Sequence, residues 1–242
     1  MLQGDGSPLL SSFDPSENGT PETRWSDFLS SREEWAPKRG GLVVVSPHPD
    51  DELLGAGGLI RDTAMAGEAV TIVSVTDGEA AYPQGGVLGS VRRLELTTAL
   101  RKLCLFHINI VRVGIPDGRV SRHINRLRNA VLAVLRPSAT LIAPFEQDGH
   151  PDHEATGRVC CELARSQKLA LARYPIWAWH QQEPKTLSRL RWGKFSMPSD
   201  TQRAKARALQ CFDSQLRPRG LPAILPPQVL EYFHRPYEAF VL

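Results

Sequence analysis

LVVVSPHPDDE, residues 42–52, is the stretch that decides the fold of this chain. It opens with an almost wholly apolar run, LVVVS, which is typical of a strand buried on both faces of a parallel sheet. The next six residues bring one imidazole and three carboxylates to the end of that strand. Because open parallel sheets bind ligands beyond the carboxyl ends of their strands, we expect the chemistry of the protein at this point.

The same rhythm of an apolar run followed by a longer helical stretch continues along the chain. We expect strands at 42–46, 70–75, 108–113, 140–144 and 174–179, and helices at 52–66, 90–103, 120–135 and 153–168. The remainder predicts a strand within 189–197, helices at 200–213 and 227–234, and a last strand at 237–242. This alternation predicts an α/β fold: a Rossmann-like open, mostly parallel sheet with helices on both faces, in three layers. The loops after residues 46, 75, 113 and 144 should then face one another.

The length of 242 residues allows a sizeable hydrophobic core. Residues 1–40 are rich in Ser, Pro, Gly and charge, so we expect an irregular N-terminal arm with Trp25, Phe28 and Trp35 as anchors onto the core. Residues 41–242 are expected to form a single domain.

Charge and cysteine content narrow the class of protein. The net charge of +3 is spread along the chain, which does not favour nucleic acid as a partner. The chain start has no basic region ahead of a long apolar stretch, and no segment predicts a membrane span. Cys104, Cys160, Cys161 and Cys211 contain no CxxC pair, so we expect neither disulfides nor a thiolate zinc site. A cytoplasmic protein is the expectation.

The acidic loop needs a counter-charge. Like charges a few ångströms apart raise one another's pKa unless a cation neutralises them, and a bound divalent metal is the simplest neutraliser. The alternative is that these acids only complement the positive end of a helix that begins in the loop.

A second loop offers further ligands. TLIAPFEQDGHPDHEATG, residues 140–157, places His150 and His153 three positions apart at the start of a helix. Together, His48, Asp51 and His153 would make a His₂/carboxylate set of the kind that binds Zn²⁺, or another divalent ion such as Fe²⁺, and leaves a position open for water. The alternatives are a buried or capping role for His153 and an exposed loop position for His150.

The two loops, PHPDDE at 47–52 and HPDH at 150–153, resemble the paired motifs of the PIG-L/LmbE-like metal-dependent N-deacetylase family, which is N-acetylglucosaminyl deacetylase-like. The resemblance covers roughly residues 41–241. Weaker matches are TDGE at 76–79, Arg92 with Glu95, GIPDG at 114–118, Lys205 with Ala208 and Leu209, and Ser214 with Gln215.

The resemblance implies that His48, Asp51 and His153 hold zinc and that Asp50 is the general base. It also implies that His150, oriented by Asp152, assists the oxyanion or the leaving group. This division of roles agrees with the chemistry, because zinc lowers the pKa of water and polarises an amide carbonyl. A protonated His150, favoured by a carboxylate neighbour, would stabilise the oxyanion.

The resemblance further implies that Arg92 and Asp117 bind polar groups of a small-molecule N-acyl amino sugar. Arg92 is open to a second interpretation as a solvated helix residue paired with Glu95, and Asp117 to one as a plain turn residue. Two departures stand out. Some family members have Tyr where this chain has Asp148, and His or Tyr where it has Phe212, so a gating hydroxyl is absent or displaced.

We therefore expect a zinc-dependent hydrolase that removes the N-acetyl group from a GlcNAc-type conjugate. A zinc amidase acting on another amide would use the same residues. A catalytically silent metal- or sugar-binding module is the rival from another class, but it would not need Asp50 and Asp152. The glycines at 55–58 are better explained by close helix packing than by dinucleotide binding, because the acidic loop would repel a pyrophosphate. The oligomeric state is left open.

Overall fold

The computed structural model describes residues 15, 17–82, 86–103, 105, 108–218 and 220–242. The expectation for Cys104, and most of that for residues 1–16, therefore lies outside the described residues. Cys160, Cys161 and Cys211 are free thiols, and Cys160 is buried.

Within the described residues, seven strands form one sheet in the order β3-β2-β1-β4-β5-β7-β6. The five strands from β3 to β5 run parallel, whereas β7 is antiparallel to both β5 and β6. The bounds are Leu42–Ser46 (β1), Val70–Ser74 (β2), Asn109–Arg112 (β3), Thr140–Pro144 (β4), Leu171–Tyr174 (β5), Trp192–Ser196 (β6) and Tyr237–Val241 (β7).

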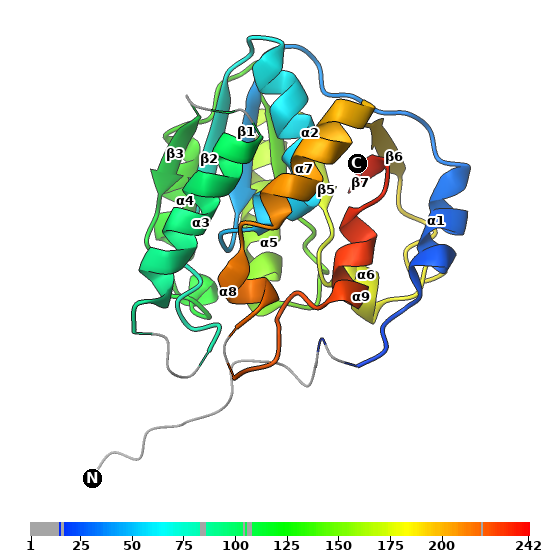
Figure 1. The fold of residues 1–242 in the computed structure, drawn as a ribbon. Coiled ribbons are helices and arrows are strands. Elements are labelled where there is room, and N and C mark those ends of the chain that lie inside the picture. The colour runs from blue at the N-terminus through cyan, green and yellow to red at the C-terminus, as the bar shows by residue number, and fades with distance from the viewer. Residues whose placement is uncertain (1–14, 16, 83–85, 104, 106–107, 219) are drawn as a thin grey trace.

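Helices cover both faces of the sheet (Figure 1). One face packs against α2, α3 and α7, and the other packs against α4 and α5. The bounds are Glu22–Ser30 (α1), Asp51–Met65 (α2), Leu88–Lys102 (α3), Ile124–Leu132 (α4), Pro151–Gln167 (α5), Ala178–Gln181 (α6), Ser199–Leu209 (α7), Asp213–Leu216 (α8) and Pro227–Leu230 (α9), with 3₁₀ turns at Val120–Arg122 (η1) and Glu231–Phe233 (η2).

Strand β1 shows why its sequence is apolar throughout. Val44 contributes to the core under α2, α3 and α7, while Val43 and Val45 contribute to the core under α4 and α5. Successive side chains of a strand point to opposite faces, so a strand covered on both sides must be apolar at every position. The predicted three-layer α/β fold with a mostly parallel sheet is confirmed.

Two local predictions were wrong. The arm is not irregular throughout, because residues 22–30 form α1. Trp25 of this helix is completely buried, and its indole N–H donates to the Trp179 carbonyl at 2.6 Å. The strand predicted at 174–179 instead ends at Tyr174, just before Pro175, and residues 178–181 form α6. Proline lacks the N–H that a sheet ladder requires, so the apolar run continues as a turn and a helix.

The sheet order fixes where the polar loops meet. β1 lies between β2 and β4. The chain builds one half of the sheet from β1 through β2 to β3, and then returns past β1 to build the other half from β4. Loops diverge at such a switch point and leave a crevice beyond the carboxyl ends of the strands. The acidic loop after β1 and the histidine loop after β4 border this crevice.

Helix α2, which begins at Asp51, is kinked at Ala56, where the backbone is non-helical (φ −145°, ψ 18°). The amides of Gly58 and Leu59 donate to the Glu238 carboxylate at 2.7 and 2.9 Å instead of to their own helix. The Lys205 ammonium donates to the carbonyl of Leu54 and to Glu238, at 2.8 and 2.7 Å. A buried ion pair thus satisfies the backbone groups that the kink exposes.

The glycines at 55–58 also have a packing role, as expected. A Cβ on Gly55 would lie 2.3 Å from the Tyr174 ring, and one on Gly58 would lie 2.2 Å from the sulfur of Met197. Both positions therefore need a glycine for close approach of α2 to its neighbours.

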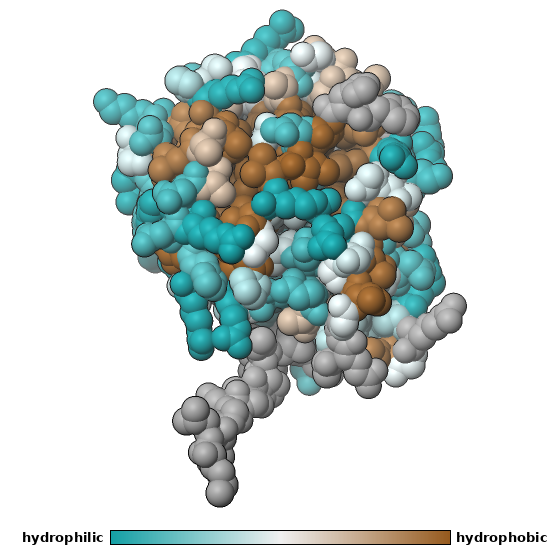
Figure 2. Space-filling view, turned by 90° about the vertical axis from the view of Figure 1, so that its left-hand side faces the viewer, coloured by the Kyte–Doolittle hydropathy of each residue, from teal (hydrophilic) through white to brown (hydrophobic). Residues whose placement is uncertain are grey.

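Strand β3 forms one edge of the sheet, because among the described residues it pairs with β2 alone. Figure 2 views the molecule from that side and shows apolar side chains gathered on it. Among the described residues, no helix is both long and apolar enough to cross a bilayer.

The buried pair at the kink predicts a large loss of stability for Lys205→Met. Removing the ammonium leaves Glu238 charged and the Leu54 carbonyl without its donor, so the free energy of unfolding should fall by about 3–5 kcal/mol. Arg203→Met, at an exposed position of the same helix, should change it by less than about 0.5 kcal/mol. Chemical unfolding of both variants measures the difference, and equal stabilities would contradict the proposed role of the pair.

Candidate metal centre and its cavity

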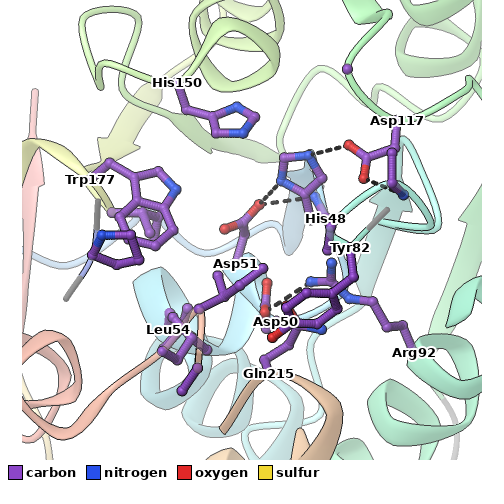
Figure 3. Close-up of a pocket in the computed structure, with 18 of the residues that line it drawn as sticks. His48, Asp50, Asp51, Leu54, Tyr82, Arg92, Asp117, His150, Trp177 and Gln215 are labelled. Atoms are coloured by element: carbon purple, nitrogen blue, oxygen red, sulfur yellow. Dashed lines mark hydrogen bonds and ion pairs between the residues drawn. The ribbon is translucent and has the colours of Figure 1, made fainter. Parts of the chain in front are cut away.

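Four loops at the carboxyl edge of the sheet converge on His48 (Figure 3). His48 and Asp51 follow β1, His153 follows β4, and Asp117 follows β3. The segment after β2 closes the group, since the Ala80 amide donates to Asp117 at 3.0 Å. The predicted meeting of these loops is therefore observed.

Three donor atoms form a nearly equilateral triangle. His48 Nδ1 lies 3.2 Å from His153 Nε2 and 3.3 Å from Asp51 Oδ2, and the last two atoms are 3.2 Å apart. The edge of a tetrahedron with bonds of about 2.0 Å, as in zinc sites, is about 3.3 Å. All three residues are buried. The triangle can thus hold a small divalent ion on one face and leave a fourth position open.

Each histidine of the triangle has a carboxylate on its other ring nitrogen. His48 Nε2 lies 3.0 Å from Asp117 Oδ1, and His153 Nδ1 lies 2.8 Å from Asp148 Oδ2. A carboxylate in this position fixes the tautomer of a metal-binding histidine and the orientation of its ring. In both pairs the other ring nitrogen, which faces the triangle, can donate its lone pair to a metal ion.

Asp148 has a larger role than its sequence position indicated. It is fully buried, and besides His153 it accepts the amides of Ile176, Trp177 and Ala178 at 2.8, 3.1 and 3.1 Å. These amides form the turn between β5 and α6. The carboxylate therefore fixes both the histidine ring and that turn, which is also why the predicted strand at 174–179 does not form.

The charges of the triangle stabilise one another. Burial alone would raise the pKa of the Asp51 carboxyl, but His153 and His48 outweigh it and hold that pKa well below its ordinary value. Burial opposes protonation of His153, yet Asp51 and Asp148 raise the pKa of its ring to about 9. For His48, Asp117 in the same way raises the pKa well above its usual value. The carboxylates thus create a site that strongly favours positive charge.

Wider groupings of the same kind also include His48. Donor atoms of His48, Asp117 and Asp152 lie within 4.8 Å of one another, as do those of His48, His150 and His153. The triangle with Asp51 is tighter than either group. In addition, the second ring nitrogen of His48 is already occupied by Asp117, so the Asp51 triangle is the better fit for an ion.

Asp50 lies beside the triangle without belonging to it. Its backbone has φ 144°, a conformation that is strained for a residue with a side chain. Its carboxylate accepts from Arg92 Nη2 at 3.0 Å. Burial raises the pKa of Asp50 to about 7, although Arg92 acts in the opposite direction. A carboxyl with this pKa can accept and release a proton near neutral pH.

The contact between Asp152 and the His150 ring is made by the backbone of Asp152 and not by its carboxylate. The Asp152 carboxylate does not contact the His150 ring but accepts the amides of Gly118 and Val120 at 2.7 and 3.1 Å. His150 Nδ1 instead accepts the backbone N–H of Asp152 at 3.2 Å, as the cap of α5. Burial and the neighbouring histidines lower the pKa of His150 to about 3, while the Asp152 charge acts in the opposite direction.

Arg92 and Asp117 are held more firmly than substrate contacts alone require. The Arg92 guanidinium donates to Asp50 and to the carbonyls of Pro49 and Gly78. Its suggested partner Glu95 instead accepts from the amide and hydroxyl of Ser214, both at 2.7 Å. Arg92 is therefore a buried support of Asp50 and not a solvated helix residue.

A cavity of about 500 Å³ opens over these groups. Besides the histidines and carboxylates, its walls include residues that sequence reasoning missed: Leu54, Tyr82, Ile176, Trp177 and residues 221–225. Phe212 is fully buried in the core. Tyr82, one of the residues that line the cavity, donates its hydroxyl to the carbonyls of Ser214 and Pro222.

The sequence of this chain is similar to a family model and to curated proteins. The family model described as PIG-L, GlcNAc-PI de-N-acetylase, matches residues 43–164, which contain both polar loops. Diacetylchitobiose deacetylase of Thermococcus kodakarensis is 29% identical over 124 residues, which are 48% of this chain and 46% of that protein. The 1D-myo-inositol 2-acetamido-2-deoxy-alpha-D-glucopyranoside deacetylase of Nocardia farcinica is 32% identical over 156 residues, 52% of each chain. The chain thus spans about half the length of the curated relatives it matches.

Among solved structures, N,N'-diacetylchitobiose deacetylase from Pyrococcus horikoshii covers 93% of both chains with a TM-score of 0.57 at 18% identity. At this identity the likeness shows the fold.

The contacts of Asp148 predict that Asp148→Ala is strongly destabilising. Three buried amides and the His153 ring would lose their acceptor, so the free energy of unfolding should fall by at least about 3 kcal/mol. Asp148→Asn keeps one acceptor oxygen and should lose less. Asp27→Ala, at an exposed position of α1, should cost less than about 0.5 kcal/mol. Unfolding curves of the three variants test the order, and an Asp148→Ala protein as stable as Asp27→Ala would contradict it.

Proposed function

The chain belongs to the PIG-L family, and from this membership and the geometry around His48 we propose that it is a metal-dependent N-deacetylase. It hydrolyses the amide C–N bond of an N-acetylated amino sugar, a small-molecule conjugate of GlcNAc type. The relatives support this reaction class, since those named above are deacetylases of acetamido sugars. We also propose a cytoplasmic location, which the free thiols Cys160, Cys161 and Cys211 support.

The single observation that carries the proposal is the triangle of donor atoms. His48, Asp51 and His153 would hold the ion, and its edges of 3.2–3.3 Å suit Zn²⁺. Two imidazoles and a carboxylate also suit another divalent ion such as Fe²⁺. An ion bound there supplies Lewis acidity, which lowers the pKa of water and polarises an amide carbonyl.

Asp50 is assigned the general base. Its pKa of about 7 allows it to take a proton from the attacking water and later deliver that proton to the departing amine. Arg92 holds the carboxylate at 3.0 Å, and Asp50 contributes no atom to the triangle, so it is available for proton transfer. A buried acid beside a metal site that does not bind the ion is the feature that favours an enzyme over a silent binding module.

For His150 we keep the expected role, and for Asp152 we propose a further one. His150 lines the cavity, where it would contact the developing oxyanion or the leaving group. Asp152 is a positioning residue, because its carboxylate fixes the backbone at Gly118 and Val120 beside Asp117.

Substrate contacts are proposed for Asp117 and Arg92, which both line the cavity. Their main bonds are to His48 and Asp50, so any contact with sugar hydroxyls is added to a supporting role. An amidase that acts on a different amide would use the same groups. It differs only in the substrate that the cavity admits.

Amine release tests the reaction class. Zinc-reconstituted protein should release primary amine from N-acetylglucosamine conjugates, and chelator treatment should abolish the release because it removes the Lewis acid. Restoration by added Zn²⁺ or Fe²⁺ is the control for damage by the chelator. Undiminished release after complete metal removal would refute a metal-dependent reaction, and the absence of release from metal-loaded protein would refute the deacetylase.

Two substitutions separate ion binding from proton transfer. Asp50→Asn should retain one metal ion per chain and lose at least about 100-fold in kcat, because it removes the base and keeps the ligands. His153→Ala should lose the metal itself. Metal content by atomic absorption and turnover are measured together for both. Normal turnover of Asp50→Asn, or stoichiometric metal in His153→Ala, would overturn the corresponding role.

A further inference from the structure

Part of the cavity wall is apolar. It is built from three separate segments: residues 80–82, residues 176–177 and residues 221–225. Figure 3 shows Trp177 and Asp117 on opposite sides of the pair formed by His48 and Asp51, with Leu54 beside the same pair. Apolar residues therefore lie on both sides of the candidate reaction centre. Trp177 lies on one side, and residues 80–82, whose Ala80 amide binds Asp117, lie on the other.

The polar groups of the cavity are largely engaged with one another. Both oxygens of Asp117 accept bonds, one from His48 and one from the Ala80 amide. Arg92 is bound to Asp50 and to two backbone carbonyls. Among the described residues that line the cavity, Gln215 Oε1 and Arg92 Nε are buried without a hydrogen-bond partner. These atoms offer polar partners to a sugar ring, whereas further buried hydroxyls without partners would be costly.

Residues 221–225, LPAIL, are an unusual loop. They connect α8 and α9 and are apolar at every position, although Leu221 is 39% exposed. Apolar side chains exposed at the mouth of a cavity are typical of ligand-binding walls.

The loop is fixed in place by its hydrogen bonds. The Tyr82 hydroxyl donates to Pro222 and Ser214 carbonyls at 3.2 and 3.3 Å, and the Leu225 amide donates to the Gln215 carbonyl at 3.1 Å. Two of the three wall segments are thereby joined into one surface.

We propose that the substrate carries, close to its acylated amine, an apolar group of several carbon atoms that this wall binds. The inference rests on the proposed function and deepens it by naming the class of substrate. A cavity of about 500 Å³ lies in the range of about 300–1,000 Å³ that encloses drug-sized ligands. An apolar group there would replace water at Trp177 and Leu221, which is favourable in proportion to the area covered.

Such a group has two possible sources on an acylated amino sugar. It is either the aglycone, joined at the anomeric carbon, or an acyl chain longer than acetyl on the nitrogen. Both present the same alkyl or aryl chemistry to the wall, and matched ligands distinguish them.

The test measures binding and not turnover. Zinc-loaded Asp50→Asn protein is titrated with three ligands: the methyl glycoside of N-acetylglucosamine, its hexyl glycoside, and the methyl glycoside of N-hexanoylglucosamine. At least one of the two ligands with a six-carbon chain should bind at least tenfold more tightly than the first, since each methylene group that is fully buried strengthens binding by about fourfold. Tighter binding of the second ligand assigns the wall to the aglycone, and tighter binding of the third assigns it to the acyl chain. Affinities within twofold for all three would overturn the proposal.

A matched pair of substitutions locates the effect. Leu221→Asn in the wall should reduce the hexyl-to-methyl affinity ratio at least threefold. Leu132→Asn, at a residue of α4 with nearly the same exposure (38% against 39%), should leave the ratio unchanged. An unchanged ratio in Leu221→Asn would refute the assigned wall.

Amine release by the wild-type protein keeps the two proposals apart. Release from all three ligands with equal affinities would keep the deacetylase and refute the apolar group. A tenfold preference in binding without any release would keep the apolar site and refute the deacetylase.

Discussion

The constraint on which the structure depends is the burial of carboxyl groups at one edge of the sheet. Each buried charge must be neutralised or solvated by the protein, and the chain does so in several ways. Asp51 is paired with two histidines, Asp50 is held by Arg92, and Asp152 is solvated by backbone amides. Burial raises the pKa of Glu52 to about 8, and its carboxyl group contacts the Ser46 hydroxyl. The remaining excess of negative charge favours a bound cation.

The scaffold supplies these partners from distant parts of the chain. Strand ends bring the histidines together, while the Lys205 and Glu238 pair supports the kinked helix that begins at Asp51. The pair does not belong to the candidate metal centre. It binds backbone groups of α2 at the kink, where a regular helix would form hydrogen bonds between its own N–H and C=O groups.

Much of this arrangement could be predicted from the sequence. The strands at 42–46 and 140–144 form at those residues, because both are continuous apolar runs that end in polar loops. The meeting of His48 with His153 followed from the rule that strand ends converge in a parallel sheet. The positions of the strands, and hence the meeting of the two histidines, can be predicted from regular hydrophobic periodicity without a structure.

Other features left no such signal. Asp148 read as a departure from a motif, but its function depends on three amides of a turn that sequence patterns do not reveal. Residues 221–225 read as a loop between helices, and only the fold brings them to the cavity beside Trp177. The role of Asp117 is similar, because a Pro-Asp-Gly turn gives no indication that its carboxylate contacts a histidine. Side-chain contacts between segments distant in sequence were therefore the part that could not be foreseen.

The position of Asp148 has a thermodynamic consequence. One carboxylate binds both the ring of His153 and the amides of Ile176 and Trp177, so Asp148 connects the ion-binding triangle to the apolar wall. An ion that fixes the His153 ring would through Asp148 also fix this part of the wall, and the coupling free energy between two sites is reciprocal. A ligand that fills the wall would then tighten the hold on the ion by the same factor by which the ion tightens the hold on the ligand.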